Sequence, residues 1–186
     1  DRTRIAYTDD QEVGDEKDLY VLDLPSGAPQ KLTGPHQAGQ YVSTIRWSPD
    51  GSQLLIYGDL EGDATYALYV VSAAGGPPVP VSDPDDLVFY SSWGWSPDST
   101  RLTYQASTVA AGVNGPLSVF TVKADGTGRT NVSGAMVAGG RVRPLQIGAG
   151  ESPWSPDSSR IAFIADKEVD EKFELYTVKP DGTGLL

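Results

Sequence analysis

Acidic residues at closely spaced positions give the chain three candidate cation-binding loops. They read DDQEVGDEKD at residues 9–18, DLEGD at 59–63 and DKEVDEKFE at 166–174. Carboxylate oxygens spaced in this way are ligands that Ca²⁺ accepts, although no loop has the glycine and the terminal glutamate of an EF-hand. The same charges would also keep exposed hairpin tips from aggregating, or attract a basic partner. We therefore expect no obligatory cofactor, and the calcium ligands that this pattern would supply are Asp166, Glu168 and Asp170.

Cationic and aromatic side chains gather in three longer segments. Residues 34–44 hold the single histidine, residues 83–94 hold an aromatic cluster, and residues 134–152 contain two arginines. Arginines and aromatic rings can hold a peptide segment or a carboxylate. The alternative is that these residues are structural. We favour strand core for Phe89 and Trp93. For the arginines and for Tyr90, partner binding and a structural role both stay open, the structural role of the arginines being to pair with nearby acids. The candidate partner-binding residues are His36, Tyr90, Arg141 and Arg143.

The sequence does not predict catalysis. It contains no cysteine, so thiol nucleophiles, thiolate metal sites and disulfides are excluded together. The nearest approach to the G-x-S-x-G turn of serine hydrolases is GWSPD at residues 94–98, which lacks the last glycine. One histidine in a loop far from such a serine does not complete a triad, and no Walker loop, dinucleotide fingerprint or HExxH is present. We expect a chain that is not an enzyme.

The overall charge narrows the class of partner. The formal net charge is −11, and the pI is about 4.4. An acidic surface repels phosphate backbones, so nucleic acid is not an expected partner. No apolar run approaches the length that crosses a bilayer, so no membrane span is expected.

A repeated unit must position these loops. Three segments align on a tryptophan, WSPDGSQLLIY at Trp47, WSPDSTRLTY at Trp95 and WSPDSSRIAF at Trp154, and the first residues, TRIAYTDD, match SRIAFIAD at 159–166. Each copy continues into a second apolar run and a turn rich in glycine, proline or aspartate. Short runs of Val, Tyr, Leu and Ile closed by turn residues predict β-strands, and the pattern predicts fourteen of them.

The WSPD box itself is predicted to be structural, because it occurs once per repeat whereas a catalytic acid is needed once. Proline presets φ at the turn, aspartate or serine can accept a backbone N–H, and Gly51 can take positive φ. The tryptophans are expected to fill the space between successive sheets, and each indole N–H is expected to find a hydrogen-bond partner. The residues of this structural repeat are Trp47, Pro49, Asp50, Trp95, Pro97, Asp98, Trp154, Pro156 and Asp157.

The order W-S-P-D-G/S, E/D-L-Y-x-V and D-G-T-G resembles the TolB-like, WD40-like repeat of β-propellers, and the resemblance covers essentially the whole chain. It implies an all-β propeller segment of four-stranded antiparallel blades. The first copy lacks its WSPD box and the last ends at DGTGLL, so about four blades are expected, the first and last incomplete, in a partial or open propeller. The expected single domain, 1–186, divides into blades at 1–40, 41–89, 90–145 and 146–186.

In such blades the WSPD turns lie at one end of the strands, and the loops of variable length lie at the other. Variable loops on a rigid scaffold are the usual place for binding. The resemblance therefore implies a non-catalytic scaffold that binds a protein or peptide on its variable-loop face, in an extracytoplasmic location (periplasmic or cell-surface). The alternative is the substrate-gating propeller of a prolyl-oligopeptidase-like serine peptidase whose catalytic domain is absent from this chain. Uncovered blade faces would also allow self-association.

Overall fold

The computed structural model describes residues 3–10, 14, 16–25, 27–35, 38–108, 115–143 and 152–186, without the side chains of residues 90–92. These residues form strands and turns, and no helix among them is long and apolar enough to cross a bilayer. The strands are β1 (Arg4–Asp9), β2 (Asp18–Asp23), β3 (Gln30–Lys31), β4 (Tyr41–Trp47), β5 (Gln53–Asp59), β6 (Ala67–Ser72), β7 (Val79–Pro80), β8 (Asp86–Trp95), β9 (Arg101–Thr108), β10 (Ser118–Lys123), β11 (Thr130–Asn131), β12 (Val142–Arg143), β13 (Ile161–Ala165) and β14 (Glu174–Val178).

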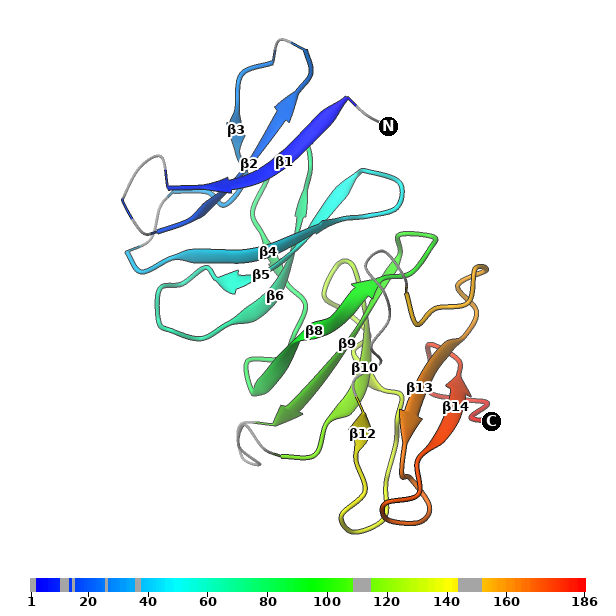
Figure 1. The fold of residues 1–186 in the computed structure, drawn as a ribbon. Coiled ribbons are helices and arrows are strands. Elements are labelled where there is room, and N and C mark those ends of the chain that lie inside the picture. The colour runs from blue at the N-terminus through cyan, green and yellow to red at the C-terminus, as the bar shows by residue number, and fades with distance from the viewer. Residues whose placement is uncertain are drawn as a thin grey trace. The chain divides into compact units, whose positions relative to one another are not determined.

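The chain divides into two compact units, residues 1–83 and 84–186, each made of two antiparallel sheets. The first unit holds the sheets β1-β2-β3 and β4-β5-β6-β7, and the second holds β8-β9-β10-β11 and β12-β13-β14 (Figure 1). Neighbours in each sheet follow one another in the sequence, which is the meander of a propeller blade. The sheets of three, four, four and three strands confirm the predicted all-β fold with incomplete first and last blades.

Two sheets begin earlier than the sequence indicated. Strand β8 starts at Asp86, inside the segment assigned to the second blade, and β12 starts at Val142, inside the segment assigned to the third. The segment 83–94, expected to be a connection, is therefore largely strand. Its pairing with β9 shifts register between Val88 and Trp93. Such an irregularity breaks the alternation by which a strand is recognised in a sequence.

The three WSPD turns have one hydrogen-bond pattern. In each copy the serine hydroxyl donates to an aspartate oxygen at 2.6 Å, and the same hydroxyl oxygen accepts a backbone N–H from five residues further on at 2.9 to 3.0 Å. The residue after the aspartate has positive φ in every copy, 71° at Gly51, 62° at Ser99 and 60° at Ser158. The two serines adopt a conformation that favours glycine, and the shared hydrogen bonds hold them in it.

Two of the repeat tryptophans show how successive sheets pack within a unit. Trp154 is 6% exposed and belongs to an apolar cluster that also contains Val119 of β10 and Val132, which directly follows β11. Trp47 packs, partly buried, against the core of the first unit, and the guanidinium carbon of Arg4 lies 5.2 Å from its ring centroid. The indole N–H of Trp154 has no hydrogen-bond partner among the described residues.

The first and last sheets each carry an exposed apolar side chain. Ile5 on β1 is 46% exposed, and Leu175 on β14 is 67% exposed. Side chains of this kind are buried when a further sheet or a second chain covers them. Self-association through these faces stays a prediction.

Candidate functional site

A cavity of about 780 Å³ lies at the variable-loop end of the second unit. One wall is the segment that enters β10, another is the connection that enters β12, and Phe89 of β8 contributes to the lining. The lining residues are Phe89, Gly115, Pro116, Leu117, Ser118, Gly134, Met136, Val137, Gly139, Gly140, Arg141, Val142 and Arg143. The cavity has the size of ordinary small-ligand pockets and is lined by apolar groups and two cations.

Glycines allow the connection into β12 to approach the neighbouring acidic loop closely. A Cβ added at Gly140 would lie 2.8 Å from the backbone oxygen of Asp166, and Gly139 has a φ of +85°. A side chain is excluded at the first position by contact with backbone and disfavoured at the second by conformation. The two glycines therefore fix the wall that carries the arginines.

Lys167 fastens the same connection to the acidic loop. Its ammonium donates to the backbone oxygen of Ser133 at 2.9 Å and to that of Ala135, and its own backbone oxygen accepts the N–H of Val137 at 3.0 Å. Three backbone groups within residues 133–137 are thus paired with Lys167. The result is a cavity wall held at several points along its length.

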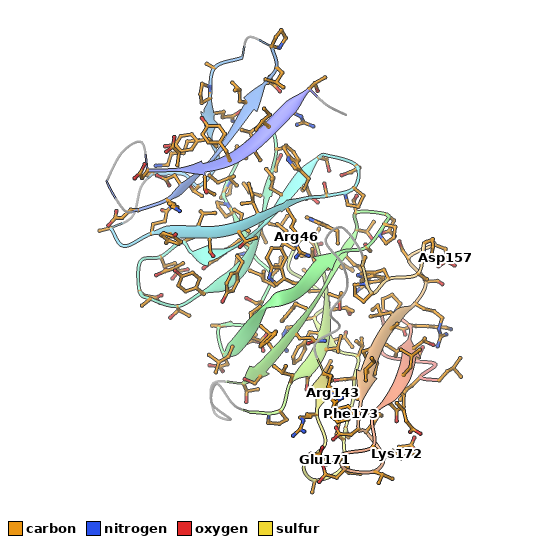
Figure 2. The ribbon with its side chains drawn as sticks, viewed as in Figure 1. Arg46, Arg143, Asp157, Glu171, Lys172 and Phe173 are labelled. Carbon is orange, nitrogen blue, oxygen red and sulfur yellow. The ribbon has the colours of Figure 1, made fainter. Side chains whose placement is uncertain are left out.

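The two predicted arginines meet one aromatic ring. The guanidinium carbon of Arg143 lies 3.5 Å from the ring centroid of Phe173, and that of Arg141 lies 5.7 Å from it. Arg141 also pairs with Glu171, with 2.9 Å between Nη2 and Oε1. Figure 2 shows Arg143 beside Phe173, with Glu171 on the loop nearby. Of the two outcomes left open by the sequence, Arg141 pairs with an acid, whereas Arg143 has no ion pair among the described residues.

The side chains of the other two predicted binding residues are not described by the structure. His36 lies outside the described residues, and so does the side chain of Tyr90, whose backbone belongs to β8. Trp93 is 3% exposed, as expected for strand core. Phe89 is 36% exposed and lines the cavity, so the expectation that it is core is wrong. The irregular pairing of β8 between Val88 and Trp93 explains why its position could not be read from alternation.

The acidic loop groups its carboxylates differently from the predicted set of Asp166, Glu168 and Asp170. Oxygen atoms of Asp166, Asp170 and Glu171 lie within 4.8 Å of one another. Glu168 is exposed and is not part of this group of described residues. The group forms because the second carboxylate oxygen of Asp166 accepts the backbone N–H of Glu171 at 3.0 Å, which folds the loop back by five residues.

Backbone N–H groups already donate hydrogen bonds to both oxygens of the buried carboxylate in that loop. Asp166 is fully buried, and its other oxygen accepts the N–H of Arg141. This N–H lowers the pKa of Asp166 below its ordinary value. The Asp59 carboxylate organises its loop in the first unit by a similar hydrogen bond, accepting the N–H of Ala64 at 2.7 Å. The residue five positions after each aspartate has positive φ, 67° at Ala64 and 63° at Glu171. Loop organisation is thus a sufficient role for these aspartates, and calcium binding stays a prediction.

Several residues of the site were missed by reasoning from the sequence. Phe173 and Glu171 sit in the charged run DKEVDEKFE, where the pattern drew attention to the acids. Met136 and Val137 sit in a connection of small residues with no periodicity. The one available signal was that Phe173 is the single aromatic residue in that acidic loop. A ring in a solvated loop needs a contact to cover it.

Taken together, sheets of three or four antiparallel strands, repeated WSPD turns and a cavity at the opposite end define a chain of the β-propeller class. No protein-family model matches the chain. A protein of Bacillus subtilis (strain 168), named uncharacterized peptidase YuxL, is 31% identical to it, in a match that covers 89% of this chain and 28% of the relative. The chain thus spans little more than a quarter of that relative.

Solved structures show the same fold. A TolB candidate from Agrobacterium tumefaciens superimposes with a TM-score of 0.54 at 22% identity, covering 90% of this chain and 53% of that one. A puromycin-hydrolyzing peptidase of Mycobacterium tuberculosis superimposes with a TM-score of 0.57 at 12% identity, covering 99% of this chain and 26% of that one. Likeness at these identities establishes the fold and leaves the activity to the site.

Proposed function

We propose that this chain is a non-catalytic propeller segment that binds a peptide, or an extended segment of a protein, at the variable-loop end of its second unit. The observation that carries the proposal is the cavity of about 780 Å³. Arg143 lines it without an acidic partner among the described residues, and Leu117, Met136 and Val137 supply apolar surface. Apolar walls with a few directed polar groups are the usual composition of a binding site.

The lining residues support a role in binding without catalysis. Within the described part of the chain, they include one hydroxyl, that of Ser118, and no histidine, cysteine, lysine or carboxylate. A serine nucleophile needs an adjacent base, and general acid–base catalysis needs a group that titrates near the working pH. Arginine stays protonated and supplies neither function.

The similarity to YuxL favours a particular setting for this binding role. That relative is named a peptidase, and the match reaches across 89% of the present chain. In the peptidase setting the propeller would admit and orient peptides for a catalytic domain outside this chain, and the cavity would be a substrate-binding surface. In the TolB-like setting it would hold a protein partner in an extracytoplasmic compartment. Both settings need the same cavity.

The binding role can be tested by selection of peptides on the full chain. A random dodecapeptide phage library is panned on the immobilised 186-residue protein, and enriched peptides are synthesised and titrated. The test variant is Arg141→Glu with Arg143→Glu. The matched control is Lys123→Glu with Lys179→Glu, which makes the same change of charge at exposed positions near the opposite ends of β10 and β14.

We expect enriched peptides to bind the native chain and the control equally, and to bind the arginine variant at least about tenfold more weakly. Equal binding to all three proteins would contradict the proposed position of the site. Failure to enrich any peptide would contradict the binding role. The two settings are separated by the coding sequence that follows Leu186 in the source genome, because a G-x-S-x-G turn with a later histidine is required by the peptidase setting alone.

A further inference from the structure

We infer that the cavity recognises a carboxylate of its peptide, from a Glu or Asp side chain or from a C-terminus, and that Arg143 binds this carboxylate through hydrogen bonds. This inference rests on the proposed function and adds the chemical class of the bound group. The first observation is the state of Arg143. The chain has 25 acidic and 14 basic side chains, yet this guanidinium has no acidic partner among the described residues.

Phe173 holds the guanidinium in a defined plane. With 3.5 Å between the guanidinium carbon and the ring centroid, the two groups are in van der Waals contact face to face or nearly so. Stacking occupies the face of the guanidinium and leaves the N–H groups at its edge. Those N–H groups form a rigid fork that matches the two oxygens of a carboxylate. The stacked ring therefore preorganises a bidentate donor at the cavity.

The surrounding charges favour a singly charged group over a multiply charged one. The neighbouring Arg141 is already paired with Glu171, whose carboxylate lies close to those of Asp166 and Asp170. A phosphate or another dianion would meet the repulsion of these acids, whereas one carboxylate can be held by the directed hydrogen bonds of Arg143. Selectivity then comes from geometry at short range rather than from a broad positive field.

Apolar surface beside Arg143 indicates which type of residue stands next to the carboxylate in the bound peptide. Leu117, Met136, Val137 and Phe89 line the same cavity, and Val137 and Phe89 are each 36% exposed. A residue with an aliphatic side chain next to the acidic residue would cover these groups. The expected ligand is thus a short peptide in which an apolar residue precedes a carboxylate.

Three capped peptides test this inference on the isotope-labelled 186-residue chain. They are Ac-Ala-Leu-Glu-NH2, its neutral isostere Ac-Ala-Leu-Gln-NH2, and Ac-Ala-Leu-Gln-OH, which moves the carboxylate to the C-terminus. NMR titration gives each dissociation constant and follows the Nε–H signal of Arg143, assigned by its loss in Arg143→Gln. We expect at least one carboxylate peptide to bind on the order of tenfold more tightly than the neutral peptide, with a shift of the Arg143 signal. The carboxylate peptide that binds more tightly shows whether the cavity prefers a side-chain carboxylate or a C-terminal one.

Two variants distinguish recognition from general charge. Arg143→Gln should remove the difference between acidic and neutral peptides, and Arg143→Lys should restore only part of it because an ammonium lacks the planar fork. Backbone signals outside the cavity should be unchanged in both, which reports an intact fold. Equal binding of all three peptides at the cavity would overturn the carboxylate inference and leave the binding role standing. Absence of binding by all three would overturn the carboxylate inference, whereas the binding role is decided by the peptide selection described above.

Discussion

Removal of the Asp86 carboxylate should destabilise the second unit strongly. Asp86 begins β8 and is 4% exposed. Its oxygens lie 2.6 and 2.8 Å from Nη2 of Arg129, and the buried hydroxyl of Tyr104 donates to Oδ2 at 2.7 Å. Arg129 also lies with its guanidinium carbon 3.9 Å from the ring centroid of Phe120. The network joins strands β8, β9 and β10 with Arg129, the residue that precedes β11.

The expected loss in the free energy of unfolding depends on which groups lose their partner in Asp86→Ala. Loss of one partner of a buried ion pair costs about 3–5 kcal/mol when the other charge stays dry. The Arg129 side chain is 30% exposed, so water replaces part of the lost interaction, and the hydroxyl of Tyr104 keeps its hydrogen bond from Arg129. We therefore expect a loss of about 2–4 kcal/mol in the free energy of unfolding. Tyr104→Phe removes one hydroxyl and should cost about 1 kcal/mol.

Urea unfolding of the full chain, followed by tryptophan fluorescence and by amide exchange in β9 (Arg101–Thr108), measures these losses. The double variant should lose less than the sum of the single losses, because both residues belong to one network. A loss below about 0.5 kcal/mol for Asp86→Ala would show that the network adds no net stability and would refute this reasoning. Exchange in β5 (Gln53–Asp59) of the other unit is the internal control.

Three further outcomes are expected. The hydrogen bond from the Ser155 hydroxyl is the main cause that lowers the pKa of Asp157 to about 2. The stability that this carboxylate contributes is therefore present above its ordinary pKa of 3.8 and is lost as the pH falls toward 2. Ser155→Ala should raise the pKa of Asp157, measured by carboxyl ¹³C NMR titration, and an unchanged pKa would contradict the assigned cause. Trp154→Ala should cost about 3–5 kcal/mol in urea unfolding, because the indole is 6% exposed in an apolar cluster, and a loss under 1 kcal/mol would remove its packing role. Asp59→Ala should cost about 1–3 kcal/mol and speed amide exchange at Ala64, because its carboxylate organises the loop; unchanged exchange there would argue against this.

The sequence predicted those parts of the fold that depend on local and repeated chemistry. The WSPD turns and the order of the strands follow from residues a few positions apart and from the repeat, so the sequence pattern was enough to predict them. The start of β8 at Asp86 was missed because register slips between Val88 and Trp93, which no local pattern records. Irregular pairing of this kind is set by the neighbouring strand.

The candidate site was predicted in part for the same reason. Arg141 and Arg143 could be named from their type and from the length of their segment, but their partners lie 30 residues away in the sequence. The contact with Phe173 depends on how the acidic loop folds. That loop turns back at Glu171, which has positive φ without being glycine, and so brings Glu171 rather than Glu168 to Asp166. A conformation that the residue type disfavours cannot be anticipated from residue type.

The central claim is that binding occurs at the variable-loop end of the second unit and leaves the two WSPD turns of that unit free. Hydrogen exchange of the full chain, with and without a peptide enriched by selection, tests it most directly. We predict slowed exchange at residues 133–143 and 166–175, and unchanged exchange at residues 96–101 and 155–160. Protection confined to the two WSPD turns, with none at the cavity, would contradict the account.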